Sequence, residues 1–131
     1  MGRYYSGDIE GKFWFGVQSS DDASNFGGTE EMLEDEEGEE IALQYSFFKE
    51  DIPGIEEALK ETEHALGDYK QKIQDFFSTH DSYNDEMITR DTGIAPDKVK
   101  RVLELYARII LGDKILACVK ENGQCVFECE L

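Results

Sequence analysis

Residues 30–40 hold the densest set of side chains in the chain that could do chemistry. Eight of these eleven residues carry a carboxylate, and no basic residue occurs between Lys12 and Lys49. Carboxylates at this density repel one another and create a field that attracts cations and basic protein surfaces. Contacts to phosphates require Lys or Arg, so direct binding of nucleic acid through this segment is not expected. The carboxylates are those of Glu30, Glu31, Glu34, Asp35, Glu36, Glu37, Glu39 and Glu40.

The spacing of the polar residues gives little support to other chemistry. A calcium loop needs oxygen ligands at alternate positions before a terminal bidentate Glu, whereas the acids at 34–37 are consecutive. The chain has no Gly-rich phosphate loop, nucleophile elbow or HExxH sequence, and its two histidines, His64 and His80, are far apart in the sequence. We therefore predict no catalytic residue, no metal and no cofactor, and a protein that is not an enzyme.

The cysteines are odd in number and lie close together near residue 120. A secreted disulfide scaffold would have an even, dispersed set, so a reducing, cytoplasmic compartment is predicted. The spacing of Cys118, Cys125 and Cys129 matches no zinc site. On a strand, Cys125, Phe127 and Cys129 would share one face, because side chains alternate with a period of two. This pattern predicts buried thiols in the core.

Residues 87–103 resemble a helix-turn-helix, with a short helix, a glycine turn and a second helix from Pro96. In that interpretation Val99 and Val102 face inward, and the second helix presents basic side chains to DNA. Thr89 stands where such motifs usually have a small apolar residue, and the chain as a whole is acidic rather than basic. A DNA-binding regulator is therefore an alternative function. The basic side chains are those of Lys98, Lys100 and Arg101.

The first 48 residues are predicted to be mainly β-structure. Residues 12–18 alternate apolar and polar side chains, and residues 3–6 are expected to pair with them across a glycine-bounded turn. A short helical turn is expected to open at 19–22. A highly acidic loop then covers about 27–40, and another alternating strand follows at 41–48. The acids are thus expected in a solvated loop between two strands.

Trp14 is the sole tryptophan, and the alternation places it opposite Phe13, Phe15 and Val17. If those three side chains face the helices, Trp14 lies on the other face of the sheet beside tyrosines and acids. An aromatic ring on a partly open acidic face is typical of a hot spot in a protein–protein interface. Packing of the ring in the core is the default interpretation, and Trp14 is also a candidate partner-binding residue.

After the β-structure, the apolar pattern changes to helical spacing. Apolar residues, among them Leu59, Leu66 and Ile73, step by three and four through 53–78 without a slip. This pattern predicts one continuous helix over 53–78, in which Gly67 costs about 1 kcal/mol relative to Ala. The remaining predicted elements are a short helix at 84–91, a long helix at 96–122 and a closing strand at 124–130.

The length of the chain and the order of its predicted elements limit the possible fold classes. The 131 residues suffice for a single domain over residues 1–131, and a hydrophobic content of 40% excludes a wholly disordered acidic chain. Runs of strands followed by runs of helices indicate an α+β fold. We expect a small, mainly antiparallel sheet of about four strands with helices packed on one face, in the order ββ(α)β-ααα-β. With no apolar run of 18 residues and no signal-peptide core, neither a membrane span nor secretion is expected.

Two segments, YYSGDIEGKFWFGVQSSDDA at 4–23 and LACVKENGQCVFECEL at 116–131, carry a resemblance to known proteins. Both are similar to segments of small, uncharacterised proteins encoded by phages and other large DNA viruses. The resemblance brings no activity with it. It implies a role of the kind that small acidic phage proteins often have, which is to act on host defence as anti-restriction or anti-CRISPR inhibitors. Many such proteins imitate DNA to occupy the basic cleft of a nuclease.

Together these observations predict a non-enzymatic acidic protein that binds and inhibits a basic, nucleic-acid-binding host protein by DNA mimicry. Carboxylates of the acidic loop and of the following helix start would take phosphate positions. Electrostatics would speed association, and Trp14 would supply affinity. A small-ligand-binding or hydrolytic protein whose site is not visible in the sequence is a further alternative. The helix-start residues are Glu50, Asp51, Glu56, Glu57 and Glu61.

Overall fold

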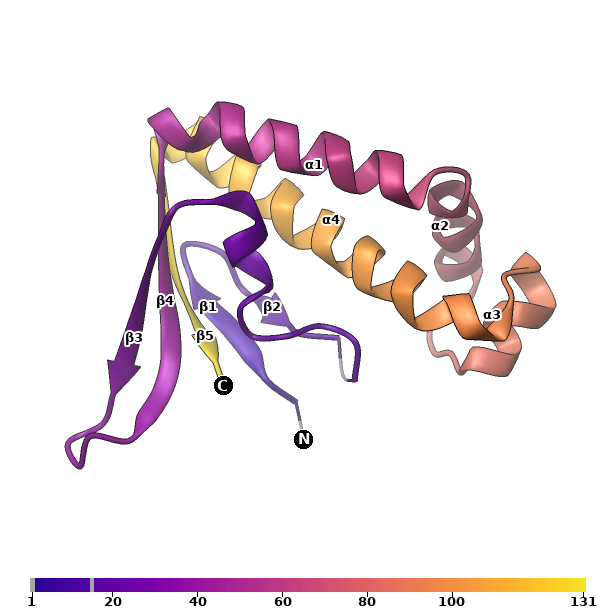
Figure 1. The fold of residues 1–131 in the computed structure, drawn as a ribbon, viewed down its shortest axis with the longest axis horizontal. Coiled ribbons are helices and arrows are strands. Elements are labelled where there is room, and N and C mark those ends of the chain that lie inside the picture. Colours follow the sequence, from indigo (N-terminus) through magenta and orange to yellow (C-terminus); the bar gives the residue numbers. More distant parts are fainter. Residues whose placement is uncertain (1, 15) are drawn as a thin grey trace.

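The computed structural model describes residues 2–14 and 16–131. Within these residues, five antiparallel strands form one sheet, and the helices lie on one side of it (Figure 1). This arrangement confirms the predicted α+β fold, with one strand more than expected because part of the acidic run is itself a strand. The strands are β1 (Tyr4–Gly7), β2 (Gly11–Lys12), β3 (Thr29–Glu34), β4 (Glu40–Phe48) and β5 (Gln124–Glu130), in the order β2-β1-β5-β4-β3.

β5 lies in the middle of the sheet, between β1 and β4. Its alternation buries Cys125, Phe127 and Cys129 on the side that faces the helices. The Phe127 ring stacks on that of Phe47, with 6.2 Å between centroids, and on that of Tyr45, with 5.8 Å. The core of the sheet is therefore built from stacked aromatic rings flanked by small thiols.

The three cysteines are free and buried, which confirms the predicted burial of the thiols. Burial raises the pKa of Cys129 to about 12, and the Glu30 carboxylate adds to the rise. Burial also raises the pKa of Cys125, and the neighbouring Cys118 side chain contributes. Because the thiolate is the reactive form of cysteine, these two side chains serve packing rather than chemistry at neutral pH.

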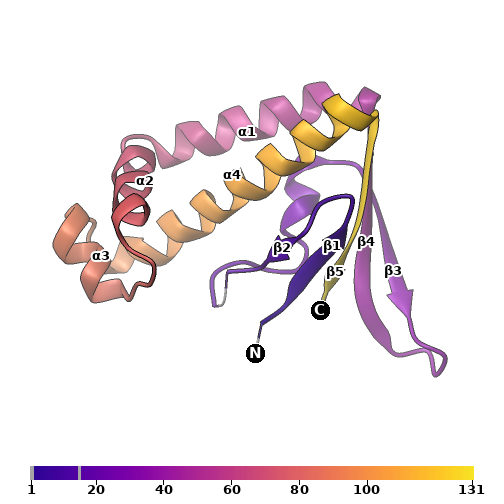
Figure 2. The ribbon, with the colours of Figure 1, turned by 180° about the vertical axis from the view of Figure 1, so that it is seen from behind.

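In the described part of the chain, four α-helices and two 3-10 helices complete the fold. The long α4 packs along α1, and α2 and α3 gather at the end of α4 that is remote from the sheet (Figures 1 and 2). The bounds predicted for the short helix before α4, for α4 and for β5 are confirmed to within one residue. The helices are η1 (Asp22–Phe26), η2 (Lys49–Asp51), α1 (Ile52–Leu66), α2 (Tyr69–Thr79), α3 (Asp85–Thr92) and α4 (Pro96–Asn122).

Residues 53–78 do not form one helix, so that prediction is wrong. α1 ends at Leu66, and α2 begins after a two-residue turn in which Gly67 adopts φ +58° and ψ −135°. A helix cannot continue through this backbone conformation. Leu59, Leu66 and Ile73 are nevertheless buried, as predicted. The apolar spacing is the same for a continuous helix and for two helices that pack on the same core, so it could not reveal the break.

The break gives a first testable prediction. Gly67→Ala should lower the free energy of unfolding by about 1–3 kcal/mol, because a residue with a Cβ is strained at this φ and ψ. Gly54→Ala is the matched control: Gly54 lies in the first turn of α1 with open space around it, and Ala there should stabilise by about 0.5–1 kcal/mol. Urea titrations of both variants measure the difference. A neutral or stabilising Gly67→Ala would mean that the helix continues.

The predicted strand over 12–18 is mostly wrong, because β2 ends after two residues. The chain then turns: the N–H of Val17 donates to the carbonyl of Trp14 at 3.1 Å, and Gly16 has φ +77°. Residue types alternate as in a strand, but the positive φ at Gly16 ends any extended conformation. Of the residues predicted on the core-facing side, Phe13 is buried, Val17 is half-buried, and Phe15 lies outside the described residues.

A buried polar network fixes the segment before β3 to α4. Asp22 is 2% exposed, and its carboxylate accepts hydrogen bonds from Arg108 Nε and Gln18 Nε2, both at 2.9 Å. Asn25 Nδ2 donates a further, longer bond of 3.3 Å. Arg108 also pairs with Glu104 at 3.2 Å. Two opposite charges are thus held out of water in contact, which makes the loss of one partner costly.

Candidate partner-binding surface

The acidic run folds into a β-hairpin, so the prediction of a loop over 27–40 is wrong. β3 pairs with β4 in antiparallel register, with Met32 opposite Leu43, and residues 35–39 form the turn. Main-chain hydrogen bonds and the apolar residues of both strands offset the repulsion between the carboxylates. We call β3, the turn and β4 the acidic hairpin. It projects beyond the helices, with its turn at the lower left of Figure 1.

Asp35 organises the turn of the acidic hairpin. Its Oδ1 accepts hydrogen bonds from the N–H groups of Glu37 and Glu39, both at 2.9 Å, as in an Asx-turn. The N–H of Asp35 donates to the carbonyl of Glu39 at 2.9 Å, and Gly38 takes φ +81°. The acids at the tip therefore sit on a hydrogen-bonded turn rather than on an irregular loop.

All eight carboxylates of the acidic hairpin are exposed, and the hairpin has no basic side chain. Glu30 differs from the others because its carboxylate accepts a hydrogen bond from the Tyr45 hydroxyl. Burial, and next the Glu30 carboxylate, raise the pKa of Tyr45, so this hydroxyl stays protonated and donates. Asp35 and Glu30 thus have structural roles. The acids whose side chains are left to water are Glu31, Glu34, Glu36, Glu37, Glu39 and Glu40.

Three exposed apolar side chains lie near these acids. Met32, Ile41 and Leu131 are 39%, 50% and 48% exposed. The register places them on the face of the sheet that carries Leu43 and Cys129, and their exposure shows that the helices do not reach this end of the face. Apolar side chains rimmed by charged ones are the usual composition of a protein–protein interface.

The acids predicted at the helix start do not join the acidic hairpin. They lie in η2 and on α1, at the other end of β4 from the turn, and the nine residues of β4 span about 30 Å. Asp51 accepts a hydrogen bond from the N–H of Phe48 at 2.8 Å, and Glu56 lies 3.5 Å from the ammonium of Lys120. The predicted site is therefore divided in two. The separate residues are Glu50, Asp51, Glu56, Glu57 and Glu61.

Trp14 lies at the opposite edge of the sheet from the acidic hairpin, because it follows β2, and β2 and β3 are the two edge strands. Its ring packs edge-on against Phe77 and Tyr106, with 5.3 and 5.8 Å between centroids, and Tyr83 lies at 6.1 Å. The predicted position of Trp14 on an open acidic sheet face is wrong. β2 ends at Lys12, so Trp14 is outside the sheet, and its ring packs on the helices.

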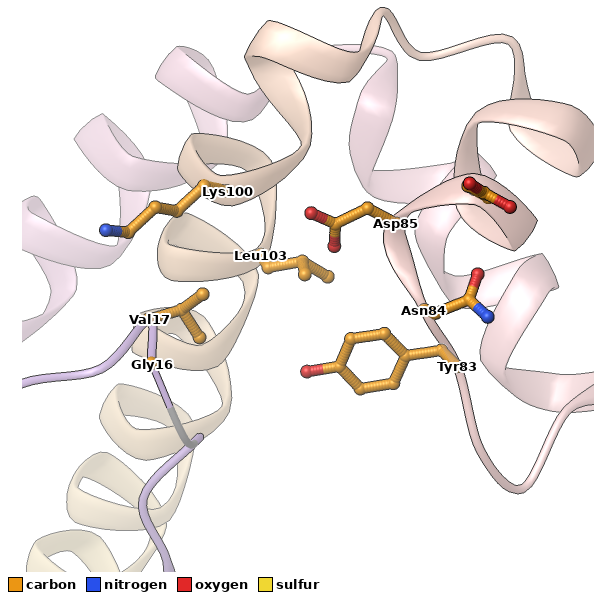
Figure 3. A pocket seen from close by; sticks show the side chains of 8 residues that line it. Gly16, Val17, Tyr83, Asn84, Asp85, Lys100 and Leu103 are labelled. Carbon is orange, nitrogen blue, oxygen red and sulfur yellow. The ribbon is translucent and has the colours of Figure 1, made fainter.

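A pocket of about 900 Å³ lies beside these aromatic rings (Figure 3). The Tyr83 ring points across it toward residues 16–17, and the Lys100 ammonium points away from Asp85. Burial, and next the Asp85 carboxylate, raise the pKa of Tyr83, so its hydroxyl is a hydrogen-bond donor rather than a base. The pocket offers hydrogen bonds and charges of both signs. It is lined by Gly16, Val17, Tyr83, Asn84, Asp85, Glu86, Lys100 and Leu103.

α3 and α4 have the outline of a helix-turn-helix. Gly93 ends α3 with φ +77°, and Val99 and Val102 are buried, as predicted. The three basic side chains predicted to face outward are exposed, but Arg101 pairs with Glu104 at 2.5 Å. Acids are interspersed on the same two helices, so the surface lacks the basic footprint of a DNA-binding module. These acids are Asp85, Glu86, Asp91 and Asp97.

No protein family model matches the chain, and no match was found among curated proteins or solved structures. The resemblance of residues 4–23 and 116–131 to viral proteins therefore stays a prediction. In the part of the chain that the structure describes, no three His, Cys, Asp or Glu side chains are grouped so as to hold a metal ion. Among the described helices, none combines the length and the apolar character needed to cross a bilayer.

Proposed function

We propose that this protein binds a basic surface of another protein through the acidic hairpin, and that it acts by binding rather than by catalysis. The observation that carries the proposal is the exposure of eight carboxylates on one projecting hairpin that has no basic side chain. A local field of this sign steers cationic surfaces toward the hairpin and repels nucleic acid.

The charge spacing supports a partner that normally binds nucleic acid. Residues in a β-strand rise by about 3.4 Å each, and one DNA strand carries one phosphate per about 3.4 Å of helix axis. Within β3, the adjacent Glu30 and Glu31 present negative charge at close to that axial density, with one carboxylate on each face of the strand. A protein whose basic cleft holds nucleic acid, such as a defence nuclease, is the class of partner that fits this surface, and occupation of its cleft would inhibit it.

Attraction between charges speeds association, but short-range contacts supply most of the affinity in a typical interface. In this protein the side chains placed to make those contacts are Met32, Ile41 and Leu131, which are exposed at the same end of the sheet as the acids. We assign to these three side chains the role of supplying affinity, which the sequence alone had assigned to Trp14. The proposed binding surface therefore consists of carboxylates around a small apolar centre.

The proposal is tested by capture of a partner and competition with DNA. Immobilised protein should retain basic nucleic-acid-binding proteins from a nuclease-treated extract of the cells that produce it, and duplex DNA should displace them. The test variant, which we call the hairpin variant, carries Glu34→Gln, Glu36→Gln and Glu37→Gln. It keeps Asp35 and Glu30, which have structural roles. It should retain much less of the partner. Equal retention by the hairpin variant, or partners that DNA cannot displace, would contradict the proposal.

A DNA-binding regulator is the second candidate, because α3 and α4 share the outline of a helix-turn-helix and α4 exposes basic side chains. This function requires that the wild-type protein bind duplex DNA tightly and that the double variant Lys98→Glu, Arg101→Glu lose that binding. The acids on the two helices oppose it, because they repel phosphates. A mobility-shift titration with duplex DNA separates the two candidates directly.

A further inference from the structure

The outer edge of β3 is unoccupied by any other strand of the described chain. β3 is the last strand in the sheet order and pairs with β4 alone. Figures 1 and 2 show its other edge facing away from the rest of the molecule. An edge strand presents a row of N–H and C=O groups that another chain can pair with.

The hydrogen bonding of β4 shows which residues of β3 direct their main chain outward. The N–H of Leu131 donates to the carbonyl of Ile41 at 3.4 Å, so Ile41 and every second residue after it direct their main-chain groups toward β5. The residues between them, such as Ala42, direct their main-chain N–H and C=O groups toward β3. Because Leu33 lies opposite Ala42, the inward-facing residues of β3 are Thr29, Glu31 and Leu33. Glu30 and Met32 therefore direct their N–H and C=O groups out of the sheet.

We infer that this free edge accepts an extended, basic segment of the partner as an added β-strand. The inference rests on the proposed function and specifies how the partner is held. Two independent features converge on the same strand: outward main-chain groups at Glu30 and Met32, and carboxylates on both of its faces. In strand addition the main chain supplies affinity and alternate side chains supply specificity.

The side chains of β3 define the sequence that would bind. Glu30, Met32 and Glu34 lie on the face toward the helices, and Glu31 and Leu33 lie on the opposite face. An added strand would place its own side chains beside these on each face. The fitting segment therefore has Lys or Arg next to the glutamates and apolar, β-branched residues next to Met32 and Leu33.

A second copy of this chain is a poor occupant for the same edge. Pairing of two β3 strands would bring the carboxylates of two acidic hairpins together, and neither hairpin has a basic side chain to offset them. Like charges on an edge strand are a common device against self-association. Charge complementarity thus selects a basic partner.

The test uses a ten-residue peptide in which pairs of Lys alternate with pairs of Val, so that each face of the added strand presents both residue types, and amide hydrogen exchange followed by NMR. In the free protein the amides of Glu30 and Met32 should exchange fast, and those of Glu31 and Leu33 slowly. Binding of the peptide should protect Glu30 and Met32. Met32→Pro removes the outward N–H, a substitution that an edge strand tolerates, and should weaken binding at least about tenfold. Met32→Thr loses the same apolar side chain but keeps the N–H, so it should bind about tenfold more tightly than Met32→Pro.

Several outcomes would overturn the inference while leaving the proposed function intact. Binding that shifts hairpin signals without protecting Glu30 and Met32 would do so, as would equal affinities of Met32→Pro and Met32→Thr. Dimerisation through β3, seen by light scattering, would also overturn it. The wild-type exchange experiment needs no variant, so it decides the matter even if Met32→Pro fails to fold. The proposed function would fail by a different result, in the capture experiment: the hairpin variant would retain as much partner as the wild type.

Discussion

The hairpin variant should associate with its basic partner about ten to a hundred times more slowly than the wild type at low ionic strength. Its three substitutions remove exposed charges and leave the Asp35 hydrogen bonds of the turn in place. The dissociation rate should change much less, because steering acts before contact is made. Stopped-flow or surface-based kinetics with the captured partner measure both rates.

Ionic strength and a matched variant sharpen this prediction. The difference in association rate should shrink as salt shortens the Debye length from about 10 Å at 0.1 M to about 3 Å at 1 M. The control carries Glu50→Gln, Glu57→Gln and Glu61→Gln, which removes the same charge from η2 and α1. Because β4 separates those acids from the turn, this control should slow association far less. Equal slowing by both variants would show that net charge, and not the acidic hairpin, attracts the partner.

Asp22→Ala should lower the free energy of unfolding by about 3 kcal/mol, the second large effect expected from the structure. The substitution leaves the Arg108 guanidinium, which is 16% exposed, with Glu104 as its remaining carboxylate partner. It also removes the 2.9 Å acceptor of Gln18 Nε2, which is then left with the more distant carbonyl of Ala107 at 3.5 Å, whereas Asn25 Nδ2 keeps the main-chain carbonyl of residue 22 at 2.8 Å. A buried donor without an acceptor costs about 1–3 kcal/mol. Urea unfolding at neutral pH measures the loss.

The neighbouring Asp21 provides the control. Asp21 is exposed, and its carboxylate accepts a hydrogen bond from the Ser19 hydroxyl at the surface. Asp21→Ala should change the free energy of unfolding by no more than about 0.5 kcal/mol. Equal effects of the two substitutions would mean that the network of Asp22 does not fix η1 to α4.

Elements bounded by local signals could be predicted from the sequence. Asn84 caps α3 with its side chain, Gly93 ends it, and Pro96 opens α4. Gly123 ends α4 with φ +82°, and the alternation of β5 starts at the next residue. In each case the residue that sets the boundary acts on its own backbone or on backbone within three residues of it, so no tertiary contact is needed to find it.

The errors arose where distant contacts decide the structure. β3 has two adjacent apolar residues among acids, and so it lacks the alternating pattern of a strand. It forms a strand because it pairs with β4, and the run of acids gave no sign of that pairing. Trp14 was placed by an alternation that continues past the turn at Gly16. The role of Asp22 depends on Arg108, 86 residues away in the sequence, and no local pattern reports such a pair. The candidate site was therefore found in part: its acids were identified, but not the strand edge or the apolar residues beside them.

The central position of β5 has a consequence for how the chain matures during synthesis. β3 and β4 are close in the sequence and can pair as soon as both have left the ribosome. The opposite edge of β4 stays unpaired until residues 49–123 have been made, because the strand that pairs with it, β5, follows them in the sequence. During that interval the aromatic face of β4 and the main chain of its open edge are exposed to other chains. Throughout this period the dense negative charge that the nascent hairpin already carries repels other copies of the same chain.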